Sequence, residues 1–448
     1  MNKVSFYLLI IMMLFFDQAF AQQTLTLEES KQLALQNNYK IKNSRLEVDA
    51  ARQKKKAAFT NYFPTVSASG ATFKAQEDLI EISTQGGNLP VYDGNPANLS
   101  SPTQFAYLPS STIGMMKSGT LGMLSIVQPI FAGGRITTGN KLASLGEDVN
   151  KYKSRLSQNE VLLKTEEQYW LVISLDEKLN TIQKYEEFLN SLLRQTEDAY
   201  NSGIVLKNDV LKVKLKRSEI LLNKSKAENG KKLAIMAFCQ YIGIPYDSSL
   251  VLKDSLAVTD FPQTYYVDNL EVLKTRTEYK LLQSSIRAEE LQTKMKLGEY
   301  LPQAGIGVAE LYTKIDEGKD RTIGMIFGTL SIPISGWWEA SHTLSERRVK
   351  EKIAQNNFND NSELLLLQMQ KAWLDFTDAY KQVLLSEEAK TQAQENLKIN
   401  QASYNNGLSN ISDLLEAQAM LQQINDQLTD AKASYRSQLL LYLQITGR

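Results

Sequence analysis

The chain of 448 residues has one cysteine, Cys239, and one histidine, His342. A single cysteine excludes a disulfide framework within the chain. A single histidine argues against histidine-based zinc sites and against catalytic triads that need a histidine base. These counts do not exclude catalysis by carboxylates alone, but no constellation of residues supports an enzyme. We therefore predict no cofactor, no metal site and no catalytic site, and we do not expect an enzyme.

An excess of charge is also absent, because 50 Lys and Arg residues balance 50 Asp and Glu residues. A nucleic-acid-binding protein would carry a basic excess, so no nucleic-acid partner is expected. After the N-terminal segment no run reaches eighteen apolar residues, which argues against a membrane-spanning helix in the mature chain. A membrane β-barrel stays open, because each of its strands gives only a weak signal.

The first 21 residues have the pattern of a secretory signal peptide. Lys3 precedes an apolar run over 4–16, and the small-residue pattern "AFA" stands before Gln22. This run is too short to cross a bilayer as a helix. We expect cleavage after Ala21, and the alternative is a retained anchor.

The chain repeats a polar phrase. "AYNSGIVLKNDV" at 199–210 returns as "SYNNGLSNISDL" at 403–414, displaced by 204 positions. Pro129 and Pro333 keep this offset, whereas Pro64 and Pro302 are 238 positions apart. The first copy therefore holds 34 extra residues between its proline markers. They are rich in Gly, Pro, Ser and Asn, which predicts a long exposed loop over 76–117.

The fold class predicted from this repeat is mixed, with the same element order in each copy. The first repeat covers 22–243, a linker follows over 244–269, and the second repeat covers 270–448. Each repeat is expected to hold a helix, two strands, a long helix and a return helix. The strands are predicted near 61–75, 119–131, 300–314 and 322–335, and the helices over 27–60, 136–200, 210–242, 270–299, 338–403 and 414–445. Four strands are too few to close a membrane barrel, so several copies must share one.

The long helices carry coiled-coil spacing, with apolar positions alternating at intervals of three and four over 175–200 and 414–435. This spacing predicts helices packed side by side over many turns. The repeated phrase is then the turn of a helical hairpin, with tips near 200–209 and 404–413. Gly203 and Gly407 are expected to end a helix in the left-handed conformation. Asp209 and Asp413 are expected to cap the return helices. Thr26 and Glu29 match a capping box at the start of the first helix.

Several motifs occur together, in order and duplicated. They are "LTLEESKQLALQNN" near the mature start, "YFP" and "YLP" before the first strand of each copy, "QPIFAGGR" after the second strand, and the pair "YNSG" and "YNNG" each followed by Asp. With them, residues 22–448 resemble the TolC-like outer membrane efflux protein family. The resemblance implies a homotrimer whose chains share one 12-stranded membrane β-barrel, continued into the periplasm by an α-helical coiled-coil barrel.

The resemblance also implies a function. The trimer would be an outer-membrane channel, the exit duct of a tripartite efflux system. Its partners would be outer-membrane lipid, a periplasmic adaptor (membrane fusion protein) and an inner-membrane pump of RND or ABC type. One alternative is a duct for type I protein secretion. Another is a soluble periplasmic coiled-coil scaffold without a pore.

Candidate site residues follow from the family layout. Asp413 and Glu416 match acidic positions that ring the periplasmic entrance, and their spacing also fits a simple helix cap. Tyr404 fits a tyrosine that latches the closed tip, while Ser409 stands where a basic partner is expected. The tip turns and adaptor-docking positions are Tyr200, Asn201, Gly203, Asp209, Tyr404, Asn405 and Gly407. The barrel–helix junction holds Pro64, Pro129, Pro302, Pro333, Trp337 and Trp338. The two tryptophans form either an interfacial aromatic belt or packing at the junction.

Overall fold

In a computed structural model, the structure describes residues 24–258, 261–316 and 318–448. The expected signal peptide lies outside these residues. The chain forms two compact units. The helical unit comprises the described parts of 24–52, 145–287 and 352–448, and the sheet unit comprises 53–144 and 288–351. Across the described residues, no helix has both the length and the apolar character that crossing a membrane would require.

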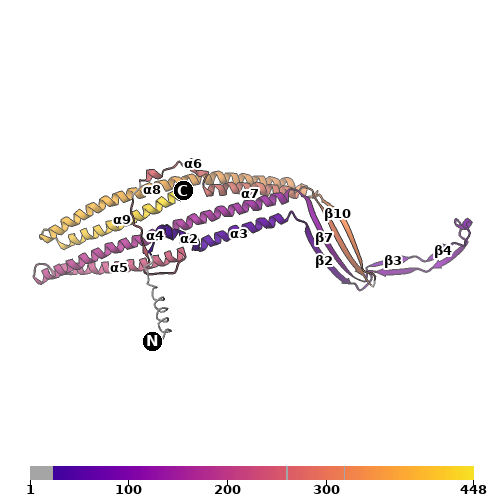
Figure 1. Cartoon of the computed structure of the whole chain (residues 1–448), viewed down its shortest axis with the longest axis horizontal. Helices are drawn as coiled ribbons and strands as arrows, with labels where there is room; N and C mark the ends of the chain where they lie inside the picture. The colour runs from indigo at the N-terminus through magenta and orange to yellow at the C-terminus, as the bar shows by residue number, and fades with distance from the viewer. Residues whose placement is uncertain (1–23, 259–260, 317) are drawn as a thin grey trace, which may run out of the picture. The chain divides into compact units, whose positions relative to one another are not determined.

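The sheet unit contains a four-stranded antiparallel sheet. Its strands are β2 (Thr65–Lys74), β7 (Ser118–Ala132), β9 (Gln303–Ile315) and β10 (Arg321–Ser331), in the order β10-β9-β7-β2. Figure 1 shows β2, β7 and β10 running side by side in this sheet. The β7–β9 register shifts between Pro129 and Phe131, because proline cannot donate a ladder hydrogen bond. Within the described chain β2 and β10 are edge strands that lack an outer partner.

Two strand boundaries differ from the prediction for the same reason. The strand expected from residue 61 begins at Thr65, and the one expected to reach 335 ends at Ser331. The amides of 61–63 instead donate to the last carbonyls of the preceding helix, and the amide of Gly336 donates to Pro333. The prolines at 64 and 333 have no amide hydrogen, so they sit outside the ladder.

The segment predicted as a loop over 76–117 is partly β-structure. It contains the pair β3 (Ile80–Thr84) with β6 (Ser111–Met115), the pair β4 (Gly87–Val91) with β5 (Gln104–Leu108), and a short 3-10 turn, η1 (Pro96–Asn98). We call this segment the ribbon. Ile80 lies opposite Met115 and Ile82 opposite Ile113, so alternate positions share one apolar face. The alternation covers few residues, and the surrounding Gly, Pro, Ser and Asn favoured a loop, so the sequence did not predict these strands.

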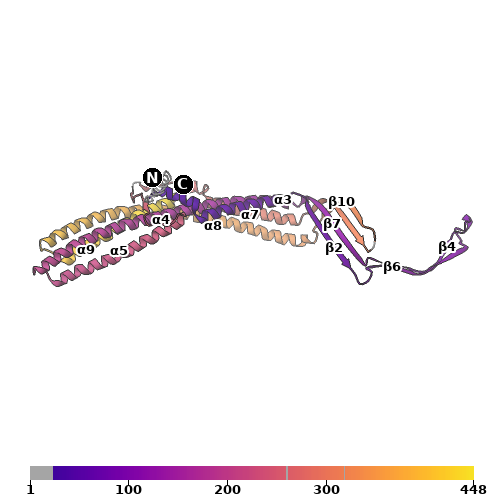
Figure 2. The ribbon, with the colours of Figure 1, turned by 60° about the horizontal axis from the view of Figure 1, so that its bottom comes forward.

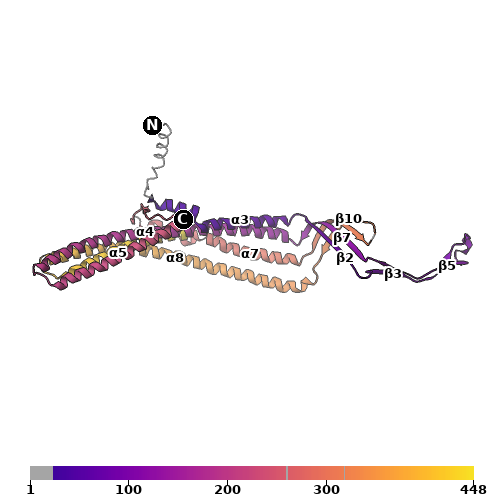
Figure 3. The same cartoon turned by 90° about the horizontal axis from the view of Figure 1, so that it is seen from below.

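The helices form two antiparallel hairpins in the helical unit. They are α4 (Arg135–Asn201) with α5 (Lys207–Ile242), and α8 (Gly336–Asn405) with α9 (Ile411–Ile445). Figure 1 shows α8 beside α9, and Figures 2 and 3 show α4 beside α5. The smaller elements are α2 (Leu27–Asn37), α3 (Tyr39–Thr60), α6 (Asn269–Leu273), α7 (Thr277–Glu299), the turn η2 (Pro262–Tyr265), and the parallel pair β1 (Thr24–Leu25) and β8 (Val251–Leu252).

Two helices predicted as continuous are broken. The one expected over 27–60 divides at Asn38, which is extended. The side-chain nitrogen of Asn38 donates to the Tyr241 carbonyl at 2.8 Å, and its side-chain oxygen accepts from the Lys40 backbone amide at 2.8 Å. The helix expected over 270–299 divides between α6 and α7, where the buried Arg276 forms an ion pair with Glu278 at 2.8 Å. At Asn38 the side chain thus bonds both a nearby amide and a carbonyl from a distant segment, and these bonds compete with helix continuation.

The helix start predicted at Thr26 is confirmed. The Thr26 hydroxyl accepts from the Glu29 amide at 3.3 Å, and the Glu29 carboxylate accepts from the Thr26 amide at 2.8 Å. Nearby, a buried core joins Tyr169 and Val161 of α4 to Phe238 of α5 and Ile41 of α3. This core fixes the base of the first hairpin.

Candidate functional site

The two hairpin tips are built alike. Gly203 and Gly407 both have φ of +72°, so the predicted left-handed ends are confirmed. At the first tip the Ile204 amide donates to Ala199 at 2.8 Å and the Gly203 amide to Tyr200 at 2.9 Å. Leu408 and Gly407 make the equivalent bonds to Ser403 and Tyr404 at 2.8 and 3.0 Å. Each tip is therefore a Schellman turn, which satisfies the last helical carbonyls.

The predicted caps of the return helices are wrong. Asn410, not Asp413, caps α9, since its side-chain oxygen accepts from the amides of Ser412 and Asp413 at 2.8 and 3.1 Å. Asp413 is the third residue of the helix and accepts from the Asn410 amide at 3.4 Å. In α5 the cap position is Leu206, which makes no side-chain bond, and Asp209 again stands third. Both helices start three residues before the predicted position.

Asp413 and Glu416 lie on the solvent-facing side of α9. Both are exposed, whereas Leu414, Leu415 and Ala417 around them are buried. The Asp413 carboxylate belongs to the capping box, and Glu416 lies one turn further along the helix. The cap that their own spacing suggested does not form, because Asn410 holds the cap position.

The equivalent positions at the first tip carry no excess charge. Asp209 and Lys212 form an ion pair at 3.5 Å. The Lys212 ammonium also donates to the Ser412 hydroxyl at 3.0 Å, which links the two hairpins. The first tip is therefore locally neutral, while the second presents two carboxylates.

A shared apolar cluster joins the tips. Ile411 and Leu414 of α9 pack with Val213 of α5 and Leu189 of α4, and Tyr404 packs against them at the edge. The Ser409 hydroxyl is buried and has no hydrogen-bond partner among the described residues. The remaining predicted tip residues, Tyr200, Asn201 and Asn405, are exposed. The cluster fixes one hairpin tip against the other.

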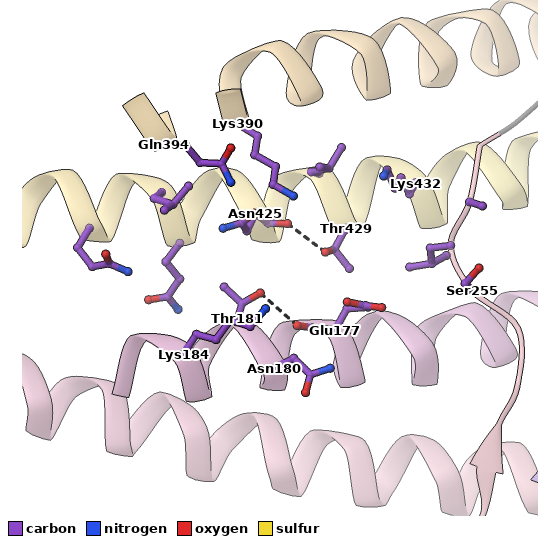
Figure 4. Close-up of a pocket in the computed structure, with 16 residues that line it drawn as sticks. Glu177, Asn180, Thr181, Lys184, Ser255, Lys390, Gln394, Asn425, Thr429 and Lys432 are labelled. Carbon is purple, nitrogen blue, oxygen red and sulfur yellow. Dashed lines mark hydrogen bonds between the residues drawn. The ribbon is translucent and has the colours of Figure 1, made fainter. Parts of the chain in front are cut away.

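A polar groove lies between the hairpins in the helical unit (Figure 4). It encloses about 560 Å³ and is lined by α4, α8, α9 and the extended residues 255–257. Lys184, Lys390 and Lys432 contribute ammonium groups, and Glu177 is the acidic residue among the lining. Lys432 also pairs with Glu387 at 3.2 Å. Sequence reasoning missed this groove because its residues come from four separate segments.

A half-buried carboxyl group, Asp426, lies on α9, with one of its oxygens shielded from solvent. Burial raises its pKa to about 6, Asp430 adds to the increase, and Lys178 opposes it. Lys178 itself pairs with Asp430 at 2.7 Å. One oxygen of Asp426 has no hydrogen-bond partner within the described chain. No short motif marks this residue, so only its tertiary surroundings identify it.

The junction residues lie in the sheet unit. The Trp337 indole donates to the Tyr300 carbonyl at 2.8 Å and is half exposed, as packing at the junction predicts. Trp338 is 81% exposed, as an interfacial position would be. Both interpretations of this pair stay predictions. Pro302 immediately precedes β9. Within the described residues no group of His, Cys, Asp and Glu side chains has a metal-binding arrangement.

Comparison with known proteins agrees with this geometry. Residues 318–448 match the family model described as "Outer membrane efflux protein". The chain is 25% identical to the outer membrane protein TolC of Escherichia coli over 356 residues, which are 72% of this chain and 68% of TolC.

Solved structures show the fold more completely. The outer membrane channel CmeC of Campylobacter jejuni matches with a TM-score of 0.75 at 14% identity, over 94% of this chain and 85% of CmeC. The outer membrane protein VceC of Vibrio cholerae matches with a TM-score of 0.71 at 14% identity, over 94% and 96%. The fold is therefore that of the outer membrane channels. The resemblance to the TolC-like outer membrane efflux family, predicted from the motifs, is confirmed.

Proposed function

We propose that three copies of this chain form one outer-membrane channel, the exit duct of a tripartite efflux system. The observation that carries the proposal is the open four-stranded sheet, whose edges β2 and β10 have no outer partner in the described chain. Unpaired edges of this length are a liability in a finished protein. Three such sheets joined edge to edge would make a closed twelve-stranded barrel, wide enough for a passage.

The two halves of the chain have corresponding roles in this proposal. Repeats over 22–243 and 270–448 would each supply two strands and one helical hairpin, joined by the linker 244–269. The twin Schellman turns at Gly203 and Gly407 support this division. The helices of three copies would form the coiled-coil barrel in the periplasm.

The tips would face the inner-membrane partners. Tyr200, Asn201 and Asp209 at one tip, with Tyr404 and Asn405 at the other, would dock a periplasmic adaptor bound to a pump. Exposed Ile204, Leu206 and Leu408 give these turns apolar surface for such contact. Asp413 and Glu416 would form the acidic ring of the entrance, six carboxylates from three copies. Their exposure supports this role, since a ring must reach the passage.

Channel activity is tested in planar bilayers with the full chain purified in detergent. We expect heat-sensitive trimers on gels and discrete single-channel conductance steps. A water-soluble protein that never inserts would support the scaffold alternative and overturn the channel.

The acidic ring is tested by multivalent-cation block from the periplasmic side. Asp413→Asn with Glu416→Gln should weaken the block at least tenfold, because like charges around one axis concentrate cations. The matched control is Asp360→Asn with Glu363→Gln, an exposed pair of the same spacing within α8. Equal block in both variants would remove the ring and leave Asp413 as a capping-box residue.

A further inference from the structure

The end of α3 carries a cluster of positive charge beside a cluster of exposed aromatic rings. Lys54 and Lys56 are exposed, and neither forms an ion pair with another described residue. Lys55, between them, has an interaction within the chain, so the argument uses only its neighbours. No acidic residue occurs between Asp49 and Glu77. This stretch of the sheet unit is therefore basic without local compensation.

The aromatic rings lie just beyond these lysines. Phe59, Tyr62 and Phe63 are all exposed, Phe59 to 54% and Phe63 to 53%. Their rings touch one another, with centroid distances of 5.5 Å from Phe59 to Tyr62 and 5.6 Å from Phe59 to Phe63. Phe59 thus contacts both other rings, and the three exposed rings form a patch that water solvates poorly. Such rings suit a membrane–water boundary.

The patch lies next to a stretch of β2 that carries no charge. From Thr65 to Phe73, β2 has no charged residue, and Lys74 ends the strand. Ten residues span about 33 Å along a strand. At a tilt of about 40° that is about 25 Å in height, the thickness of a barrel's apolar band. The rings of 59–63 then mark one edge of the band, and Lys54 and Lys56 lie just outside it.

The opposite end of the same strand carries both signs of charge, with an acidic excess. Lys74 ends the strand, and the ribbon over 76–117 contains four acidic residues and one basic residue, namely Glu77, Asp78, Glu81, Asp93 and Lys117. Near the exposed Trp338, at the helix side of the other edge strand, charges are mixed, with Glu339 and Glu346 among Arg347 and Arg348. The end of α3 therefore differs from both places, because no acidic residue lies near its lysines in the sequence.

We propose that Lys54 and Lys56, with the rings of Phe59, Tyr62 and Phe63, bind anionic glycerophospholipid headgroups at the periplasmic face of the outer membrane. The proposal rests on the proposed channel, because it needs the sheet to lie in a bilayer. The ammonium groups would contact headgroup phosphates while the rings lie at the acyl-chain boundary. Charge complementarity selects anionic lipid, since a neutral bilayer would offer the lysines no such partner.

The test uses the full-length trimer reconstituted in neutral phosphatidylcholine with increasing phosphatidylglycerol that carries brominated acyl chains. Bromine quenches the fluorescence of the exposed Trp338, so quenching reports which lipid surrounds the protein. We expect a preference for phosphatidylglycerol of about fivefold at low salt. It should fall below twofold at about 1 M salt, where the Debye length is about 3 Å.

Lys54→Gln with Lys56→Gln should reduce the preference to below twofold at every salt concentration. The matched control is Lys226→Gln with Lys232→Gln, two exposed lysines of α5 in the helical unit, and it should keep the full preference. A preference unchanged in the Lys54 and Lys56 variant overturns the proposal. So does a variant that keeps the lipid preference but loses the heat-sensitive trimer band on gels, which would assign the lysines to contacts between copies.

Conductance in pure phosphatidylcholine separates the two proposals. A wild-type protein that conducts there but shows no lipid preference overturns the lipid site and leaves the channel. A protein that never inserts overturns both.

Discussion

The capping residues of the two return helices differ in whether the side chain can accept hydrogen bonds. Asn410 offers a side-chain oxygen to two amides, whereas Leu206 at the equivalent position offers none. Both residues have the same extended backbone, with φ of −89° and −81°. At the first tip no cap side chain accepts from the equivalent amides, and the Asp209 amide bonds instead to the Leu206 carbonyl at 3.0 Å.

This difference predicts opposite effects for two substitutions. Asn410→Ala should lower the free energy of unfolding by about 1 kcal/mol, because the α9 amides lose their acceptor. Leu206→Asn should raise it by about 0.5–1 kcal/mol, because α5 gains one. Denaturant unfolding followed by circular dichroism measures both. A loss in both variants would show that the tips are stabilised by packing alone.

Asp426 makes stability depend on pH. Its pKa is near 6 in the folded chain because the carboxyl group is buried, against an ordinary value of 3.8. The folded state therefore takes up a proton as pH falls through 6, while the unfolded state does so only near 4. The ionised Asp426 carboxylate therefore lowers the free energy of unfolding by its full amount above about pH 7, and this loss becomes smaller as the pH falls towards 4.

Asp426→Asn should consequently stabilise the protein at pH 8 by about 1–3 kcal/mol. The gain should shrink as the pH falls and disappear by about pH 3, below the ordinary value of 3.8, where the wild-type carboxyl is neutral in both states. The control is Asp430→Asn, an exposed partner of Lys178, for which we expect a change of at most about 1 kcal/mol. A stabilisation that is constant between pH 4 and 8 would contradict the assigned cause.

At the scale of elements, glycines end four helices in the same way but in different surroundings. Gly203 and Gly407 have open space where a Cβ would stand. Gly243, which ends α5, has the same left-handed backbone, but a Cβ there would lie 2.4 Å from the Cβ of Asn37. The tip glycines serve the turn alone, whereas Gly243 also allows α5 to approach α2.

Alanine substitutions should separate these two roles. Gly203→Ala should cost about 1–2 kcal/mol, the price of a left-handed L-residue. Gly243→Ala should cost clearly more, because the backbone strain and the clash with Asn37 add. Thermal unfolding of the two variants is the measurement. Equal losses would mean that the Asn37 contact relaxes without cost.

The local sequence pattern predicted which segments are helices and turns. The helix break and the ribbon strands that it did not predict have physical causes. The interval of three and four residues around Leu189 and Leu414 specified long packed helices, and a glycine after a polar phrase specified each turn. The break at Asn38 depends on the Tyr241 carbonyl, which comes from a distant segment. The ribbon alternation at Ile80 and Ile82 is only two residues long, too short to outweigh its turn composition.

The sequence predicted where the candidate site lies, but it did not predict which residue caps the helix or which side chains pack together there. The repeated phrase located both tips, and the acidic pair of the second tip was visible in the sequence. The capping role passed from Asp413 to Asn410, because both residue types accept amide bonds and the helix start was misjudged by one turn. The groove and Asp426 depend on packing between separate helices, which no local pattern reports.

At the scale of the whole molecule, the proposed barrel requires β2 of one copy to pair with β10 of the next. Within one chain these strands are separated by β7 and β9, about 14 Å at the usual strand spacing. A disulfide needs Cα atoms closer than about 7 Å. Cysteines placed on the two edges can therefore join only across copies.

We expect a cysteine at Ser69 to cross-link with one of the positions 323–329, scanned singly, in a chain carrying Cys239→Ser. Denaturing gels without reductant should show linked dimers and trimers. The control, Ser67→Cys with Ser125→Cys, lies on paired strands whose hydroxyl oxygens are 2.8 Å apart, and it should give only intrachain bonds. The absence of interchain bonds at every scanned position would contradict a shared barrel.

The open edges of the sheet also set conditions before assembly. A freshly secreted subunit would cross an aqueous compartment with β2 and β10 ready to accept any extended peptide. Such a subunit needs a chaperone that shields those edges, or rapid encounter with its own kind. In the proposed trimer, two further copies are needed to cover these edges. The yield of assembled channels should therefore increase more than in proportion to the concentration of secreted subunits. Subunits produced in excess of the available chaperone would tend to aggregate through these edges.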